Sequence, residues 1–365
     1  MTERREIPQF APYLGEDEIK ELVETIRNNW ITEGPKTREF EGRIAELVGV
    51  KHAVVVNNCT IALYIALRVL GIGPGDEVIV PDFTFIASAN SVTLTGARPV
   101  FCDVDASTFN IDSASAEKVI TKRTKAMMPV HIYGQSADMD AVCDLAKRYN
   151  LKMVEDAAQG MKVTFKGKPV GGFGEINCMS FFADKTITTG EGGALFTNDD
   201  KLAEQCVILK NQGRPERGRY IHEFIGFNFR LTDLQAAVGV AQLNKLDFII
   251  LRKKEIERLY HKYLAGVPGI EFPYKDPRGY EVPFRVNILV NDPESLRLYL
   301  DTQGIGARRF FYPIHLQPCY QVKADCPNAF HAYERGLCLP SAAGMSEDDI
   351  TYVSGKIKDF LTRKV

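Results

Sequence analysis

Short apolar segments alternate with helical patterns through the first half of the chain, and this alternation limits the possible folds most. Apolar residues at helical spacing predict helices over Ile61–Leu70, with Thr60 as the cap, and over Ala137–Tyr149. The alternation predicts an α/β fold with a mostly parallel, mixed sheet between helices. We expect seven strands: Ala53–Val56, Glu77–Val80, Arg98–Cys102, Lys125–Val130, Lys152–Glu155, Asn177–Phe182 and Ala194–Thr197.

The last third of the chain has a different pattern. A long helical pattern runs from Thr232 to about Tyr263, and a turn-rich segment follows it. After that segment we expect a strand over Arg285–Val290 and helices over Pro293–Gln303 and Ser346–Arg363. These elements predict a smaller C-terminal α/β domain. The expected domains are 1–247, which also holds N-terminal helices over Glu16–Trp30 and Lys36–Val48, and 248–365.

Charge and composition exclude several classes of protein. The 365 residues carry 45 basic and 47 acidic side chains, a net charge of −2, which argues against nucleic-acid and polybasic membrane binding. No apolar run is long enough to span a bilayer, and the N-terminus does not resemble a signal peptide. The eight cysteines contain no C-x-x-C, and the histidines show no metal-ligand spacing. We therefore expect no metal site and buried thiols in a reducing cytoplasm.

A lysine followed by a glycine-rich turn is the strongest chemical signal. The expected strand that contains Ser180 continues through two aromatic residues to Lys185, and three glycines follow by residue 193. Glycine lets the backbone approach a ligand closely, and a lysine beside it either binds phosphate or forms a Schiff base. The order of residues is not that of a P-loop. On residue types alone, both roles stay open.

Weaker signals follow other strands at the same edge of the expected sheet. Asp156 ends a buried strand, although an acid there is commonly a helix cap. Asn58-Cys59-Thr60 opens a helix whose free amides suit an anion. Phe85 lies just past a strand, where a ring could stack on a ligand or belong to the core. His131 follows a further strand and is more commonly structural than catalytic.

These features together fit one small molecule. They place an anion cradle, an aromatic face, an acid and a lysine at the ends of neighbouring strands, where such sheets bind ligands. Pyridoxal 5′-phosphate (PLP) uses all four, because a carboxylate pairs with its ring nitrogen and a lysine holds its aldehyde.

Ordered motifs along nearly the whole chain resemble the DegT/DnrJ/EryC1/StrS family of PLP-dependent sugar aminotransferases. The resemblance implies a fold-type-I aminotransferase and a homodimer with shared active sites. The motifs are Gln9-Phe10-Ala11-Pro12, the helix start at Thr60, Pro81 to Phe85, His131 to Gly134, Glu155 to Gln159, Ser180 to Gly193, and Gly226 to Ala237.

The resemblance implies a role for each matching residue. Lys185 would bind the cofactor covalently, Asp156 would pair with the ring nitrogen, Gln159 would hydrogen-bond the phenolic oxygen, and Phe85 would stack on the ring. Residues that would hold the phosphate are Thr60, Cys59, Ser180 and, from the partner chain, Asn228.

The resemblance also implies the substrates, with L-glutamate as the amino donor and a keto or aldehyde sugar as the acceptor. His315 resembles the family's substrate-facing histidine. Met161 and Lys162 stand where the sugar is expected, and they depart from the usual residues of relatives. A nucleotide-linked 4-keto-6-deoxyhexose is the expected acceptor, for amino-sugar biosynthesis of a surface polysaccharide or glycosylated product. A 3-keto sugar nucleotide and an 8-oxo-octulosonate of lipopolysaccharide synthesis are the alternatives.

Two other functions remain as alternatives. A PLP-dependent sugar dehydratase would carry histidine in place of the reactive lysine, whereas Lys185 is present. A non-enzymatic ligand-binding regulator would need a DNA-binding segment, and the sequence shows no added helix-turn-helix.

Overall fold

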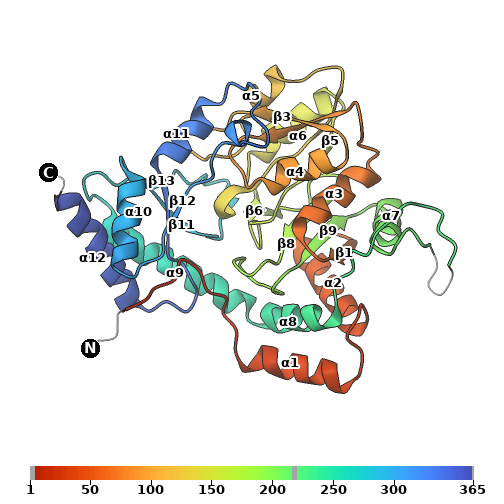
Figure 1. The fold of residues 1–365 in the computed structure, drawn as a ribbon, viewed down its shortest axis with the longest axis horizontal. Helices are drawn as coiled ribbons and strands as arrows, with labels where there is room; N and C mark the ends of the chain where they lie inside the picture. The colour runs from red at the N-terminus through yellow and green to blue at the C-terminus, as the bar shows by residue number, and fades with distance from the viewer. Residues whose placement is uncertain (1–4, 216–219, 364–365) are drawn as a thin grey trace.

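The structure is a computed structural model that describes residues 5–215 and 220–363. A large α/β unit and a smaller C-terminal unit lie side by side, and the N-terminal segment runs along both (Figure 1). This agrees with the predicted α/β architecture. The domain boundary near residue 247 stays a prediction. The first described residues pack on the C-terminal unit, because Ile7 pairs with Ile305 and belongs to that unit's core.

Seven strands of the large unit form one mixed sheet. Parallel pairing gives the order β3-β2-β4-β5, and antiparallel pairing gives β8-β9-β1. Asp156 joins the two halves, because it bridges to both Val130 and Cys178 in parallel. Only β9 runs against the others. The strands are β1 (His52–Val56), β2 (Glu77–Pro81), β3 (Arg98–Cys102), β4 (Thr124–Met127), β5 (Lys152–Met153), β8 (Asn177–Ser180) and β9 (Gly193–Thr197).

Helices cover both faces of this sheet. Val54 and Val56 of β1 pack in one core cluster with α3, whereas Val55 between them packs with α2 and α8 in another, as alternation along a strand requires. The helices of this unit are α1 (Glu16–Arg27), α2 (Pro35–Val48), α3 (Cys59–Val69), α4 (Ala87–Leu94), α5 (Ser113–Lys118), α6 (Met139–Arg148), α7 (Asp200–Lys210) and α8 (Asp233–Asn244), with the short η1 (Ile132–Gly134).

The C-terminal unit is a small antiparallel sheet with helices on it, in the order β11-β13-β12. Its elements are α9 (Leu246–Leu264), β11 (Val286–Leu289), α10 (Pro293–Thr302), β12 (Arg308–Arg309), η2 (Ile314–Leu316), α11 (Pro327–Arg335), β13 (Gly336–Leu339) and α12 (Glu347–Arg363). Among the described residues no single helix is long and apolar enough to cross a membrane, although the bent pair α8–α9 meets that requirement by length and composition.

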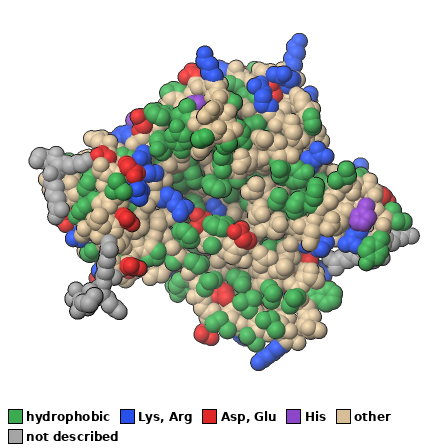
Figure 2. Space-filling view, in the orientation of Figure 1, with side chains coloured by type: hydrophobic (Ala, Val, Ile, Leu, Met, Phe, Trp, Pro, Cys, Tyr) green, Lys and Arg blue, Asp and Glu red, His purple; other side chains and the backbone are tan. Residues whose placement is uncertain are grey.

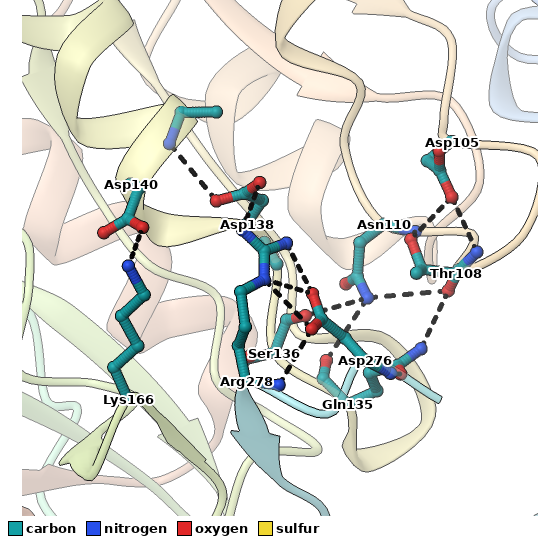
Figure 3. A network of polar contacts seen from close by, with 12 residues as sticks. Asp105, Thr108, Asn110, Gln135, Ser136, Asp138, Asp140, Lys166, Asp276 and Arg278 are labelled. Atoms are coloured by element: carbon teal, nitrogen blue, oxygen red, sulfur yellow. Dashed lines mark hydrogen bonds and ion pairs between the residues drawn. The ribbon is translucent and has the colours of Figure 1, made fainter. Parts of the chain in front are cut away.

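The segment between α9 and β11 is fixed to the large unit by a polar network (Figure 3). Asp276 pairs with Arg278, whose guanidinium also reaches Asp138 at 3.0 Å. The Gln135 side chain accepts the Asp276 amide at 2.8 Å, and Asn110 donates to the Gln135 and Ser136 carbonyls. Beside it, β10 (Gly279–Tyr280) pairs with β6 (Thr164–Phe165), which pairs with β7 (Lys168–Pro169).

Three local predictions are wrong. Asn58 rather than Thr60 caps α3, because the Asn58 side chain accepts the Ile61 amide and the helix already begins at Cys59. The long pattern after Thr232 is two helices that meet at Lys245 with a bend of 64°. The cysteines are all free, but Cys319 is exposed rather than buried.

The N-terminal helix presents its apolar side to solvent. In α1 the buried residues are Glu18 and Thr25, whereas Ile19 and Ile26 are 53% and 60% exposed. Glu18 instead bonds to Gln242 and Lys245 at the end of α8. An exposed apolar helix face of this kind is typical of a contact surface.

A buried carboxylate fixes the centre of the large unit. Glu155 accepts hydrogen bonds from the amides of Gly171, Phe173 and Gly174 and from Nε2 of His131 at 2.9 Å. The Ala137 amide donates to Nδ1 of His131, which places the ring proton on Nε2 and makes the imidazole neutral. The structural role expected for His131 agrees with these contacts.

Replacing Glu155 with Gln should lower the free energy of unfolding at pH 7 by about 3 kcal/mol, because three buried amides lose a charged acceptor. Glu204→Gln, on the exposed side of α7, is the matched control. Burial by itself raises the pKa of Glu155, but His131 and the glycine amides outweigh it, so the pKa lies below its ordinary value.

This contribution is present above the carboxyl group's unfolded pKa and is lost as the pH falls through the lowered folded value. Urea denaturation at several pH values should therefore show the gap between wild type and Glu155→Gln closing below about pH 4.5. A gap of equal size at all pH values would contradict the assignment.

Candidate active site

Lys185, the lysine predicted to be reactive, lies in the turn between β8 and β9. The side chain of Lys185 is only 15% exposed, and its Nζ lies 3.6 Å from Asp184 Oδ1 and 4.4 Å above the centre of the Phe284 ring. Burial lowers the pKa of Lys185, and the neighbouring Asp184 opposes this. The amine is therefore easier to deprotonate than a surface lysine, as a nucleophile or base requires.

The predicted acid is buried at the junction of the two halves of the sheet. Asp156 accepts hydrogen bonds from the Ser88 hydroxyl at 2.7 Å and the Ala158 amide at 3.1 Å. Burial raises the pKa of Asp156 above its ordinary value, and these bonds together with the charge of Lys185 only partly oppose the rise. The charges of Asp156 and Lys185 both act on the buried thiol of Cys59. The three residues therefore gather at one place.

The N-terminus of α3 forms an anion cradle at the same place. The Asn58 side chain binds the Ile61 amide, and the amides of Cys59 and Thr60 have no protein acceptor within the described part of the chain. Gly193 permits this geometry, because a side chain there would lie 2.5–2.6 Å from the backbone of Asn58 and Cys59. Ser180 ends the adjoining strand, buried, with its hydroxyl accepting the Phe182 amide.

Two further predicted cofactor residues lie beside the same strands. Gln159 is buried, and its side-chain oxygen accepts the Tyr133 amide at 2.6 Å, which leaves its NH₂ group as a donor. Tyr133 has a left-handed backbone (φ 55°) inside η1, a strained conformation that is common at functional sites. Phe85 is 57% exposed, as a ring that stacks on a ligand must be.

The predicted substrate histidine is held by a buried acid. Asp82 accepts the backbone amide of His315 at 2.8 Å and its Nδ1 at 2.5 Å. Asp82 follows β2 directly and is fully buried, and burial raises its pKa. The contact leaves Nε2 of His315 as the free ring nitrogen.

Met161 and Lys162, which we expect at the sugar site, have different surroundings. Met161 is 4% exposed and belongs to the core cluster of the large unit, because its apolar side chain packs inward. Lys162 faces outward and lies 3.8 Å from Asp247. Asn228 is exposed on the segment after α7, where its backbone pairs with Asn211.

Residues that sequence reasoning missed line a cavity beside Lys185. Arg285 forms a buried ion pair with Asp184 at 2.6 Å, and Lys253 and Gln9 lie in the same cavity wall. Figure 2 shows this face hollowed between the two units. The sequence carried one signal: a charged residue, Arg285, interrupts an otherwise apolar run at the start of a strand.

The converging groups fit PLP. Lys185 would hold its aldehyde, Asp156 its ring nitrogen, and the open amides of Cys59 and Thr60 its phosphate. The two open amides are the most specific of these features. Helix amides without a protein acceptor are suited to an anion, and these lie beside Gly193, where there is no room for a side chain.

Comparisons with known proteins agree with this site. The profile of the DegT/DnrJ/EryC1/StrS aminotransferase family matches residues 12–358. GDP-perosamine synthase of Caulobacter vibrioides is 41% identical and covers 99% of this chain and 100% of its own. Spore coat polysaccharide biosynthesis protein SpsC of Bacillus subtilis is 38% identical, with 97% of each chain covered. The crystal structure of DesV from S. venezuelae superposes with a TM-score of 0.89 at 36% identity, with 94% of each chain covered. The chain belongs to the DegT/DnrJ/EryC1/StrS aminotransferase family and is a PLP-dependent transaminase.

Proposed function

We propose that this transaminase moves an amino group from glutamate to a nucleotide-linked keto sugar, with a 4-keto-6-deoxyhexose as the first choice. The observation that carries the proposal is the convergence of Lys185, Asp156 and the α3 N-terminus in a chain similar along its whole length to a GDP-perosamine synthase. A 3-keto sugar nucleotide and an eight-carbon acidic keto sugar are the alternative acceptors. The cytoplasm is the expected compartment, in keeping with eight free cysteines.

The bound cofactor supplies an aldehyde that condenses reversibly with amines and a ring that accepts an electron pair. Lys185 would hold the cofactor. Once the donor has displaced it, the free amine would take the proton from the donor's α-carbon and then return a proton to complete that half of the reaction. A neutral amine is needed for this step, and burial favours it. Asp156, oriented by its hydrogen bonds from Ser88 and Ala158, would pair with the ring nitrogen and keep it protonated.

We also propose that the enzyme is a homodimer with shared sites. Five apolar side chains of the segment after α7 are exposed, namely Tyr220, Ile221, Phe224, Ile225 and Phe227, with Ile225 at 87%. Figure 2 shows apolar side chains at this right-hand end and over α1 at the lower edge. Asn228 directly follows these residues, so a partner that covers them would bring it near a second site.

Lys185→Ala should leave the fold intact and remove both the covalent attachment and multiple turnover. Borohydride reduction of the wild-type holoenzyme should bleach the visible band, and mass spectrometry should locate the reduced adduct on Lys185. Lys201→Ala, on the exposed side of α7, is the matched control. An adduct on another lysine would remove the assignment.

The amino acceptor is tested by incubating the holoenzyme with glutamate and a panel of keto sugars. We expect the nucleotide-linked 4-keto-6-deoxyhexose to give the highest kcat/KM, and the same sugar without its nucleotide to react at least 10-fold less well. A nucleotide-free sugar as the best acceptor would overturn the proposed substrate.

Ile225→Glu should weaken the dimer about 10-fold or more, because it buries a charge in an apolar contact. Light scattering over a dilution series measures the change. Leu298→Glu, an exposed leucine of α10, is the control that should leave the mass unchanged. Equal masses for the two variants at every concentration would place the interface elsewhere.

A further inference from the structure

Several buried polar groups beside Lys185 have no partner. Both polar side-chain atoms of Gln9 and one guanidinium nitrogen of Arg285 (Nη1) make no hydrogen bond within the described residues. Gln9 is 9% exposed and Arg285 is 7% exposed. A buried polar group without a partner is costly, so a cluster of them marks a place where a ligand supplies the missing bonds.

These groups surround one cavity. It is lined by Gln9, Lys185, Lys253, Phe284, Arg285 and Ser341. Its volume is about 20 Å³, which is enough for a group the size of one or two water molecules. The walls come from the N-terminal segment, from the turn of Lys185 and from the C-terminal unit.

The cavity carries an excess of positive charge even without Lys185. Lys253 is buried and donates to the carbonyls of Phe284 and Ser341, which leaves one of its three donors. Asp184 is the carboxylate that lies against these two cations, and it pairs with Arg285. The next acid, Glu257, pairs with Lys275 at 2.5 Å and so does not neutralise them. Burial, and to a smaller extent the charge of Arg285, lowers the pKa of Lys253 to about 8.

We propose that Arg285, Lys253 and Gln9 form a carboxylate-binding subsite beside the reactive lysine. The free edge of the guanidinium and the remaining Lys253 donor supply charged hydrogen bonds, and the Gln9 amide supplies a neutral one. This inference rests on the proposed function for the origin of the carboxylate, which belongs to the amino donor or to an acidic keto sugar. Asp184 acts as a positioning residue, since its ion pair fixes the guanidinium.

The test titrates the holoenzyme with 2-oxoglutarate and, separately, with its uncharged dimethyl ester, in a calorimeter. Wild type should bind the diacid at least 10-fold more tightly than the ester, and Arg285→Gln should lose that preference. Arg297→Gln, which removes an exposed ion pair of α10, is the matched control and should keep it. Because Arg285→Gln leaves Asp184 buried without its partner, the double variant Asp184→Asn/Arg285→Gln is measured too. The cofactor absorbance of each variant reports an intact site.

Steady-state kinetics then separates the two sources. A rise in KM for glutamate alone assigns the carboxylate to the donor, and a rise in KM for an acidic sugar alone assigns it to the acceptor; both support the subsite. Equal affinity of wild type for the diacid and the ester would overturn the subsite, and so would unchanged binding in both variants. Inorganic phosphate that displaces 2-oxoglutarate as effectively as a free carboxylate does would also overturn it. The titration remains decisive if no keto sugar is aminated, so its failure is distinct from failure of the proposed function.

Discussion

The structure depends on one buried carboxylate, that of Glu155. Four hydrogen bonds hold it, three from backbone amides of residues 171–174 and one from a neutral His131. They fix the strand end on which the next residue, Asp156, joins the two halves of the sheet. Adjacent acids thus have different tasks. Glu155 accepts its four hydrogen bonds from the protein. Asp156 accepts bonds from Ser88 and Ala158, and its carboxylate can also accept one from a cationic ring.

The reactive centre is assembled from three parts of the chain. The large unit supplies Lys185, Asp156 and the α3 N-terminus, the N-terminal segment supplies Gln9, and the C-terminal unit supplies Arg285. The ion pair between Asp184 and Arg285 links the residue before the lysine to the smaller unit. A buried pair of this kind contributes little net stability, because desolvation offsets the attraction, but it fixes orientation.

The sequence allowed most of the sheet to be predicted, together with the position of Lys185 just past one of its strands. Strands buried on both faces are short apolar runs, and the glycines after Lys185 mark a close backbone approach. Helix boundaries were harder. Thr60 and Asn58 are both good caps, and only the backbone bond to Ile61 distinguishes them. The bend at Lys245 has no proline or glycine to signal it. The side chain of Met161 packs into the core, which spacing alone does not reveal. The sequence could not show that Arg285 and Gln9 belong to one site, since they are separated by most of the chain and meet only through tertiary packing.

The pairing of Ile7 with Ile305 has a consequence for biosynthesis. Ile7 anchors the segment that carries Gln9. It can pair only after Ile305 has been made, nearly three hundred residues later. Loop closure over such a distance comes late in folding. The nascent polypeptide can complete its central sheet, whose last pairing joins His52 with Thr197, well before this wall is in place. The finished catalytic chamber therefore forms later than the central sheet.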